Sequence, residues 1–292
     1  MTPKLNYSFC QLISDKKRKF IKIEEFKCFY KICGLIGKGS YGCVYSAIRL
    51  SDELSVAVKH IDKHRVIDWR YFKPKNGCKT VVKIPIEIYL MDKLKTIPGI
   101  IQLIEWFETD YSFLIVMEKR QNSIDLFELK KRKLNYIFSE FEVKTIFRQL
   151  LETLNNCLKE GVIYRDVKPE NIIINVETLA IKLIDFGGGG YPTDNISDHY
   201  RGTLQYCPPE YLIHKTYFGE LQMVWSLGVL LFELVYGDIP FENEEQIVNN
   251  KTSLKIPENT STDYKNIIQK CLSRNPLRRP SVKELISNPL FI

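Results

Sequence analysis

Four polar residues near the middle of the chain have the types and spacing that phosphate chemistry requires. Asp166 is followed by Lys168 and then by Asn171. Asp185 comes after an intervening apolar run. Moving a phosphoryl group onto a hydroxyl needs a carboxylate to orient the hydroxyl, a cation to neutralise the phosphate and oxygen ligands for metal ions. These residues therefore predict phosphoryl transfer, and the alternative is a chance cluster in a surface loop.

Two strand-like stretches and one helix would position these side chains. Apolar residues 172–174 follow Asn171 directly, and further apolar residues precede Asp185. Two strands flanking a turn would bring the four polar side chains around one cleft. Residues 141–160 carry a helical period that ends at Gly161, a plausible C-cap, and this helix would support the turn from below.

A glycine-rich turn nearer the N-terminus is a second candidate phosphate site. Gly37, Gly39 and Gly42 let the backbone bend sharply and bring its N–H groups close to phosphates. Dinucleotide-binding folds use the same spacing before a helix, but residues 44–48 are strand-like here. An ordinary glycine-rich hairpin is the alternative. The next apolar strand, 56–59, ends in a lysine, which favours a phosphate-binding hairpin.

A lysine at a strand end is usually only solvated, so the partner of Lys59 decides its function. Glu87 lies in 84–91, where apolar residues recur at helical spacing, and it is the best candidate to hold Lys59. These motifs follow the order of the catalytic and metal-binding segments of protein kinases. From here the chain resembles a eukaryotic protein kinase over nearly its whole length.

The resemblance implies an α+β fold with two lobes. The N-lobe, at about 29–118, would contain an antiparallel β-sheet and one main helix, and the mainly helical C-lobe would span about 119–292. Residues 1–28 show no clear period, and we expect them to form a flexible N-terminal extension. The basic connection at 60–83 is longer than is usual in kinases.

The resemblance also implies a role for each of the first four residues. Asp166 would orient the substrate hydroxyl, and Lys168 would neutralise the transferring phosphoryl group. Asn171 and Asp185 would bind Mg²⁺. Most of the catalysis would come from positioning and electrostatic stabilisation.

ATP would bind through the N-lobe and the hinge. Lys59 would position the α- and β-phosphates, and Glu87 would hold Lys59. Met117 would be the gatekeeper behind the adenine, although plain core packing would explain it equally. The residues expected to contact ATP are Gly37, Lys38, Gly39, Ser40, Tyr41, Gly42, Val44, Ala57, Lys59, Met117, Glu118, Arg120 and Ile173.

The resemblance places the end of an activation segment at 202–210. Glu210 would be buried beneath this segment, and Arg279 would supply the cation that a buried carboxylate needs. Arg165 would pair with Asp198, because a carboxylate can accept a charge-assisted bond from arginine. The segment would then be ordered without phosphorylation. The alternative is a phosphorylation site at one of three residues: Thr193, Ser197 or Tyr200.

Several stretches resemble the Pim serine/threonine kinases more closely than they resemble kinases in general. These stretches are 66–69, 104–108, 125–128, 224–228 and 237–242. Lys168 together with Thr203 marks the Ser/Thr branch rather than the Tyr branch. Met223 stands where most kinases carry an Asp that braces the catalytic loop, and Pim kinases also lack that Asp.

Two positions depart from the expected pattern. Tyr164 replaces the usual His of the catalytic loop, and we expect a modest loss of rigidity there. Arg120 stands where the Pim hinge has a Pro that cannot donate a hydrogen bond to adenine, so a backbone N–H is restored. A pseudokinase that keeps the fold without turnover is the alternative, but every group that would touch phosphate or metal is present.

The Pim-like alignment also predicts a basic protein substrate. Carboxylates that converge on the lower lobe would anchor Arg or Lys residues upstream of the acceptor, and Arg would bind more strongly where two hydrogen bonds can form. A scatter of solvated carboxylates is the alternative. The six residues are Asp125, Glu128, Glu170, Glu233, Asp238 and Glu242.

Length and composition limit the remaining possibilities. The chain has 292 residues, of which 45% are hydrophobic and 26% charged, as is ordinary for a soluble globular protein. The eight cysteines form no C-x-x-C pair, which argues against zinc and for reduced thiols. The net charge of +7 is spread along the chain apart from a basic run at 16–19, so we expect no nucleic-acid partner.

The apolar stretch 224–236 is too short for a membrane span, and the N-terminus lacks the order of a signal peptide. We therefore expect a cytoplasmic monomer with no membrane partner. The basic run leaves a nuclear location open.

Overall fold

The computed structural model describes residues 20–39, 42–73, 81–192, 200, 202–249, 254–257 and 261–292. The chain divides into two compact units. The N-terminal unit comprises Met1–Lys93 and Gln102–Lys119, and the C-terminal unit comprises Leu94–Ile101 and Arg120–Ile292. The stretch 94–101 therefore belongs to the C-terminal unit, which a single boundary near residue 118 does not reproduce.

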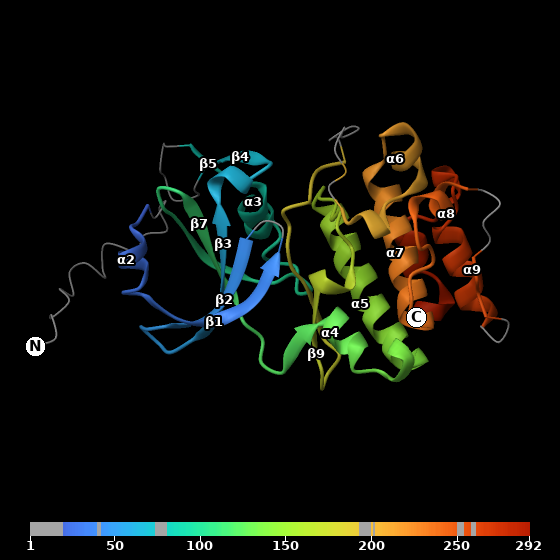
Figure 1. Cartoon of the computed structure of the whole chain (residues 1–292), viewed down its shortest axis with the longest axis horizontal. Helices are drawn as coiled ribbons and strands as arrows, with labels where there is room; N and C mark the ends of the chain where they lie inside the picture. The colour runs from blue at the N-terminus through green and yellow to red at the C-terminus, as the bar shows by residue number, and fades with distance from the viewer. Residues whose placement is uncertain are drawn as a thin grey trace, which may run out of the picture. The chain divides into compact units, whose positions relative to one another are not determined.

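A sheet of five antiparallel strands forms the N-terminal unit (Figure 1). Their order is β1 (Tyr30–Gly39), β2 (Gly42–Arg49), β3 (Ser55–Asp62), β7 (Ser112–Glu118) and β6 (Leu103–Glu108). Residues 56–59 of the central strand β3 are all buried, so both of its faces are covered. The unit also contains η1 (Lys63–Arg65), the paired strands β4 (Trp69–Phe72) and β5 (Val82–Pro85), and helix α3 (Ile86–Lys93).

The part of the predicted N-terminal extension that the structure describes belongs to this folded unit. Phe26, in α2 (Ile23–Phe26), is 2% exposed, and its ring stacks on Tyr30 and meets Phe107 edge-on, with ring centres 4.9 and 5.3 Å away. Ile21 is buried in the same cluster. The prediction of a flexible extension is therefore wrong for residues 20–28, because their aromatic and aliphatic side chains complete a core. Residues 1–19 lie outside the described residues.

Helices dominate the C-terminal unit. They are α4 (Leu126–Lys131), α5 (Glu140–Lys159), α6 (Pro209–His214), α7 (Gly219–Tyr236), α8 (Glu244–Val248), α9 (Thr262–Cys271) and α10 (Val282–Ile286). A small antiparallel sheet has the order β10 (Ile181–Leu183), β9 (Ile172–Asn175) and β8 (Ser123–Asp125). Short 3₁₀ turns are η2 (Leu134–Tyr136), η3 (Pro169–Asn171), η4 (Leu204–Tyr206), η5 (Pro276–Arg278) and η6 (Pro289–Phe291).

α5 forms where the sequence predicted a supporting helix. A capping box starts it: the Ser139 hydroxyl accepts from the Glu142 backbone N–H, and the Glu142 carboxylate accepts from the Ser139 N–H. It ends before Gly161, whose φ of +69° is a left-handed conformation that stops a helix. The turn at Glu160 and Gly161 leads the chain into the catalytic segment.

α7 is the core helix of the C-terminal unit. Its residues 222–234 are all buried. Within the described part of the chain, it is the helix that is long and apolar enough to cross a membrane, yet 72% of that stretch is buried inside the structure. Core helices commonly have such a composition, so this finding gives only weak evidence for a membrane span.

Candidate active site

In the N-terminal unit, the structure brings Lys59 and Glu87 together. Lys59 comes from β3 and Glu87 from the first turn of α3. The Lys59 Nζ lies 2.6 Å from the Glu87 Oε1, and the two residues are 5% and 3% exposed. A buried charge is tolerated only when it is paired in good geometry, so this ion pair fixes the lysine side chain within β3. The strand that the sequence predicted to end at Lys59 continues to Asp62.

The glycine-rich turn is a tight antiparallel hairpin. Across β1 and β2, Gly37 lies opposite Val44, Lys38 opposite Cys43 and Gly39 opposite Gly42. Only glycine fits at position 42, because a Cβ there would lie 1.9 Å from the carbonyl oxygen of the next strand. The predicted contact residues at the tip, Ser40 and Tyr41, lie outside the described residues.

The predicted adenine-side residues fall on both units. Ala57 and Met117 face each other across β3 and β7, and both are buried. Glu118 exchanges two hydrogen bonds with the Gln102 backbone: its N–H donates to the carbonyl at 2.9 Å, and its carboxylate accepts from the N–H at 3.0 Å. Arg120 is exposed and is the first residue of the long segment 120–292 of the C-terminal unit, and Ile173 lies on β9. Their contacts with ATP stay a prediction.

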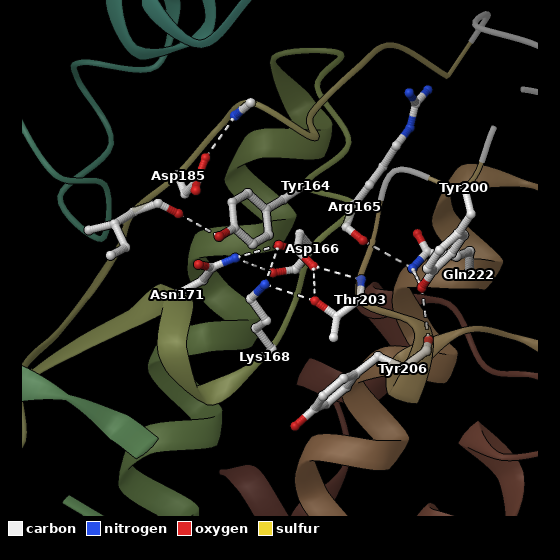
Figure 2. A network of polar contacts seen from close by, with 12 residues as sticks. Tyr164, Arg165, Asp166, Lys168, Asn171, Asp185, Tyr200, Thr203, Tyr206 and Gln222 are labelled. Atoms are coloured by element: carbon white, nitrogen blue, oxygen red, sulfur yellow. Dashed lines mark hydrogen bonds and ion pairs between the residues drawn. The ribbon is translucent and has the colours of Figure 1, made fainter. Parts of the chain in front are cut away.

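In the C-terminal unit, four hydrogen-bond donors surround the Asp166 carboxylate (Figure 2). The Thr203 backbone N–H and hydroxyl both donate to Oδ1 at 3.0 Å. The Asn171 amide donates to Oδ2 at 2.8 Å, and the Lys168 ammonium lies 2.9 Å from the same oxygen. Lys168 also donates to the Thr203 hydroxyl at 2.8 Å. Thr203, predicted only as a branch marker, is thus part of the site.

The two predicted metal ligands have suitable donor chemistry. The Asn171 amide nitrogen donates to the backbone carbonyl and the carboxylate of Asp166, so its oxygen points the other way (Figure 2). Asp185 adopts a left-handed φ of +59°, and its carboxylate accepts from the Gly187 N–H at 3.2 Å. Mg²⁺ commonly uses one or two such oxygens together with substrate phosphates. Within the described residues, no group of three or more His, Cys, Asp or Glu side chains offers another metal site.

Tyr164 anchors the catalytic loop in place of the expected His. Its hydroxyl donates to the Ile184 carbonyl at 2.5 Å, and its ring meets Phe186 edge-on with centres 5.1 Å apart. The residue is 1% exposed. Tyr164 contacts the residues on both sides of Asp185 directly. These contacts compensate for the rigidity that we expected the loop to lose without the His.

The structure also forms the ion pair expected beneath the activation segment. The Arg279 guanidinium binds the Glu210 carboxylate through two parallel hydrogen bonds of 2.7 and 2.6 Å. Both residues are buried. Such a fork-to-fork contact is among the stronger hydrogen-bonded pairs in proteins.

Arg165 is held close to the backbone that follows Asp185. A Cβ at Gly190 would lie 2.4 Å from the guanidinium, so only glycine allows this approach, and Nη2 donates to the Tyr191 carbonyl at 3.3 Å. Its predicted partner Asp198 lies outside the described residues, as do Thr193 and Ser197.

Tyr200, the third alternative phosphorylation site, is locked in place. Its hydroxyl donates to the Tyr206 carbonyl at 3.0 Å, and its backbone N–H donates to the Tyr211 hydroxyl at 2.9 Å. Burial raises the pKa of Tyr200 well above its usual value. A hydroxyl engaged in this way is poorly presented for phosphorylation.

Comparison with known proteins decides the family. The protein kinase domain matches residues 30–291. The chain belongs to the protein kinase family. This kinase is 36% identical over 280 residues to serine/threonine-protein kinase prk-2 of Caenorhabditis elegans, covering 95% of this chain and 61% of that one. It is also 36% identical over 274 residues to serine/threonine-protein kinase pim-2 of Danio rerio, covering 91% and 86%.

These matches confirm the two-lobed α+β kinase fold and the resemblance to the Pim serine/threonine kinases. The aligned region spans less than two thirds of prk-2, but most of pim-2. Yeast kinase PSK2 matches over a smaller share of its length, at 30% identity over 268 residues. By family, the chain is a protein serine/threonine kinase, which uses ATP as its phosphoryl donor.

One of the six carboxylates predicted to bind a basic substrate is placed differently by the structure. Glu233 is 3% exposed, and both of its oxygens are engaged, one by Lys130 at 2.6 Å and the other by the Tyr206 hydroxyl. It therefore stabilises the interior of the kinase rather than offering a surface charge. The prediction is wrong for this residue because its partners come from distant parts of the chain.

The other five carboxylates remain at or near the surface. Asp125 caps α4 by accepting from the Glu128 N–H, and Glu128 pairs with Lys131 at 2.7 Å. Protein atoms partly enclose the carboxyl of the surface residue Glu170, and this desolvation raises its pKa. The two that follow α7, Asp238 and Glu242, are exposed.

One further residue beside the catalytic loop could not be recognised from the sequence. Gln222, in the first turn of α7, is fully buried, and its side-chain nitrogen donates to the Arg165 carbonyl at 3.0 Å. A single Gln next to apolar residues has no distinctive signal, so only the three-dimensional contact reveals it.

Proposed function

We propose that this kinase transfers the γ-phosphoryl group of ATP to Ser or Thr in basic stretches of protein substrates, without needing phosphorylation of its own activation segment. The observation that carries this proposal is the set of four donors around the Asp166 carboxylate. These donors fix the Asp166 carboxylate as an acceptor for a hydroxyl proton, beside the Lys168 ammonium, and phosphoryl transfer to a hydroxyl requires such a carboxylate and cation.

A substrate hydroxyl would replace one of these four donors. A carboxylate accepts about four hydrogen bonds, and Asp166 already accepts four. Lys168 is the donor with the greatest freedom, because its ammonium sits on a flexible stem and 20% of its side chain is exposed. When Lys168 turns towards the transferring phosphoryl group, Oδ2 of Asp166 can accept the hydrogen bond of the attacking hydroxyl and then its proton.

The remaining residues would hold ATP and its metal. Mg²⁺ bound to Asp185 and to the Asn171 amide oxygen would supply charge neutralisation at the phosphates. Lys59 would contact the α- and β-phosphates while Glu87 fixes its position. The bonds from Asn171 to Asp166 support this proposal, because they orient the amide oxygen and the carboxylate together.

A basic substrate would relieve repulsion between carboxylates. Besides desolvation, the nearby carboxylates of Glu233 and Asp166 raise the pKa of Glu170, whereas Lys168 lowers it. An arginine side chain placed beside Glu170 would oppose this repulsion. α4 packs against η3, so Glu128 lies on a neighbouring element and could extend the acidic surface.

Contacts at both ends of the activation segment support activity without phosphorylation. At the start, Arg165 already bonds the Tyr191 carbonyl and packs against Gly190. At the end, Tyr200 and Tyr206 are joined by a hydrogen bond, and Thr203 is bonded to Asp166. A segment held by such bonds has less need of a phosphate to order it.

The first experiment measures phosphate transfer from radiolabelled ATP to an Arg-rich Ser peptide. Lys59→Met and Asp185→Asn should each lower kcat/KM by a hundredfold or more, which is about 3 kcal/mol of transition-state stabilisation. The matched controls are Lys31→Met and Asp263→Asn, at exposed positions, which should keep the parent rate. Near-parent turnover in either active-site variant, with folding verified by circular dichroism, would refute the residue roles. An inactive parent would favour the pseudokinase.

The second experiment tests the substrate and the activation segment. Peptides with Ala in place of each upstream Arg should be poorer substrates, and equal rates would contradict the basic preference. Protein treated with phosphatase, and shown by mass spectrometry to be unmodified, should phosphorylate the peptide from the first time point. A lag that ends only when the activation segment gains phosphate would contradict the proposed independence.

A further inference from the structure

The N-terminal turn of α7 lies against the catalytic loop and carries an unexplained buried amide. Met223 is fully buried and apolar, so it cannot form the polar brace that most kinases place at this position. The preceding residue, Gln222, is also fully buried. Burying a primary amide is unfavourable unless its donors and acceptors are used, so its contacts need an explanation.

The Gln222 side-chain nitrogen connects two segments of the active site (Figure 2). It donates to the Arg165 carbonyl at 3.0 Å and to the Ser226 hydroxyl at 3.0 Å. The Ser226 hydroxyl donates in turn to the Tyr206 carbonyl at 3.1 Å. The same carbonyl accepts from the Tyr200 hydroxyl, which also lies 3.4 Å from the Gln222 nitrogen.

Hydrogen-bond polarity fixes the orientation of this amide. The Arg165 carbonyl can only accept, so the nitrogen rather than the oxygen of Gln222 must face it. Ser226 uses its proton for Tyr206, so it too accepts from Gln222. The Gln222 oxygen finds no hydrogen-bond partner among the described residues. The two N–H donors therefore account for the orientation of the Gln222 amide, although leaving the amide oxygen buried without a partner is unfavourable.

We propose that Gln222 is a positioning residue that braces the catalytic loop against the end of the activation segment. It holds the peptide between Arg165 and Asp166 through the Arg165 carbonyl, and it holds the Tyr206 carbonyl through Ser226. This brace replaces the one that Met223 cannot form. The inference rests on the proposed role of Asp166, because fixing this peptide matters only if the orientation of that carboxylate limits the reaction.

Two substitutions of Gln222 distinguish the effect of its hydrogen bonds from the effect of its packing. Gln222→Met keeps the length of the side chain and removes both donors. Gln222→Glu keeps the shape, and its carboxyl can donate to the Arg165 carbonyl only when it is protonated. Burial and the facing carbonyl raise the pKa of such a carboxyl, so the donor is present at low pH and is lost as the pH rises through that value.

The other titratable and charged groups around this position should not produce the same pH response. Burial raises the pKa of Tyr200 and Tyr206 well above their usual value and that of Cys207 to about 12, so these groups stay protonated between pH 6 and 8.5. Asp166 and Arg165, on the catalytic loop, are shared by all variants. Dividing the rate of each variant by that of the parent at each pH removes their contribution.

The experiment measures kcat and KM for ATP and for a Ser peptide with the full chain at several pH values. Gln222→Met should lower kcat about tenfold or more at every pH, with KM for ATP within about twofold of the parent. Gln222→Glu should approach the parent rate at pH 6 and fall towards the Gln222→Met rate at pH 8.5. Thermal unfolding by circular dichroism shows whether each variant is folded.

The matched control is Gln149→Met, on α5. Gln149 makes a comparable set of bonds, donating to the Thr145 and Leu179 carbonyls at 2.9 Å and accepting from the Ile181 N–H at 3.2 Å. This variant should lose stability while keeping kcat. A folded Gln222→Met variant with parent kcat would overturn the inference, and so would a Gln222→Glu deficit that does not change with pH. An inactive parent would instead contradict the proposed function.

Discussion

Removing Arg279 should destabilise the C-terminal unit more than most single substitutions. Its side chain is 0% exposed, and its guanidinium binds both oxygens of Glu210, whose side chain is 10% exposed. It also donates to the Leu221 and Ser273 carbonyls at 2.9 Å and lies 5.0 Å above the Trp225 ring. Arg279→Met would leave a buried carboxylate and two carbonyls without their donor.

Breaking a buried pair by removing one partner costs about 3–5 kcal/mol, because the remaining charge stays desolvated. For a domain of this size, each kcal/mol lowers the melting temperature by about 2–4 °C. We therefore expect Arg279→Met to lower it by roughly 6–20 °C. Replacing both partners, as in Glu210→Leu with Arg279→Met, removes the stranded charge. The double variant should then be at least about 1 kcal/mol more stable than the sum of the single changes predicts.

Urea denaturation followed by circular dichroism measures these free energies. The control is Lys144→Met, which breaks an exposed pair with Glu140 whose side chains are 41% and 63% exposed. It should cost less than about 1 kcal/mol, because exposed pairs contribute little. The reasoning would be refuted if Arg279→Met cost no more than the control, or if the two single changes were simply additive.

Three further changes test other parts of the structure. Tyr164→Phe removes the donor to the Ile184 carbonyl, so it should cost about 1 kcal/mol in thermal unfolding and lower kcat measurably. Phe26→Ala should cost about 3–5 kcal/mol in urea denaturation, because it empties a fully buried aromatic site; a cost near zero would place the segment outside the core. In the folded protein at pH 8, Cys28 and Cys33 should be alkylated before the other cysteines that the structure describes, as mass spectrometry can show. Three buried thiols should react only on unfolding, because burial raises their pKa to about 12 and keeps them protonated: Cys157, Cys207 and Cys271.

The sequence was most informative where a strand or tight turn fixes a side chain directly. Asp166, Asn171 and Lys168 lie within one short turn, so their spacing alone brings them together. Lys59 and Glu87 were paired at longer range, from the helical period around Glu87 and the order of the motifs, and the structure buries both in one ion pair. The need for a cation beside a buried carboxylate, together with the resemblance to protein kinases, predicted Arg279 as the partner of Glu210, and the structure forms this pair.

Residues 20–28 were misjudged because their structure depends on distant residues. α2 has only four residues, too few to show a helical period, and it lies between two lysines, Lys22 and Lys27. What orders it is the packing of Phe26 on Tyr30 and on Phe107, far along the chain. An aromatic residue in a short irregular segment is compatible with either a flexible end or a core contact, and only the tertiary structure distinguishes them.

Glu233 and Gln222 show the same limitation for polar residues on a helix that is otherwise apolar. Sequence comparison assigned Glu233 to the surface, but Lys130 and Tyr206 satisfy both of its oxygens inside the fold. Gln222, on the same helix, donates to the Arg165 backbone carbonyl on the catalytic loop. A buried polar group needs a partner, and on α7 these partners come from the catalytic loop, the end of the activation segment and α4. The polar residues of this core helix are therefore the points at which these three parts of the C-terminal unit are held together.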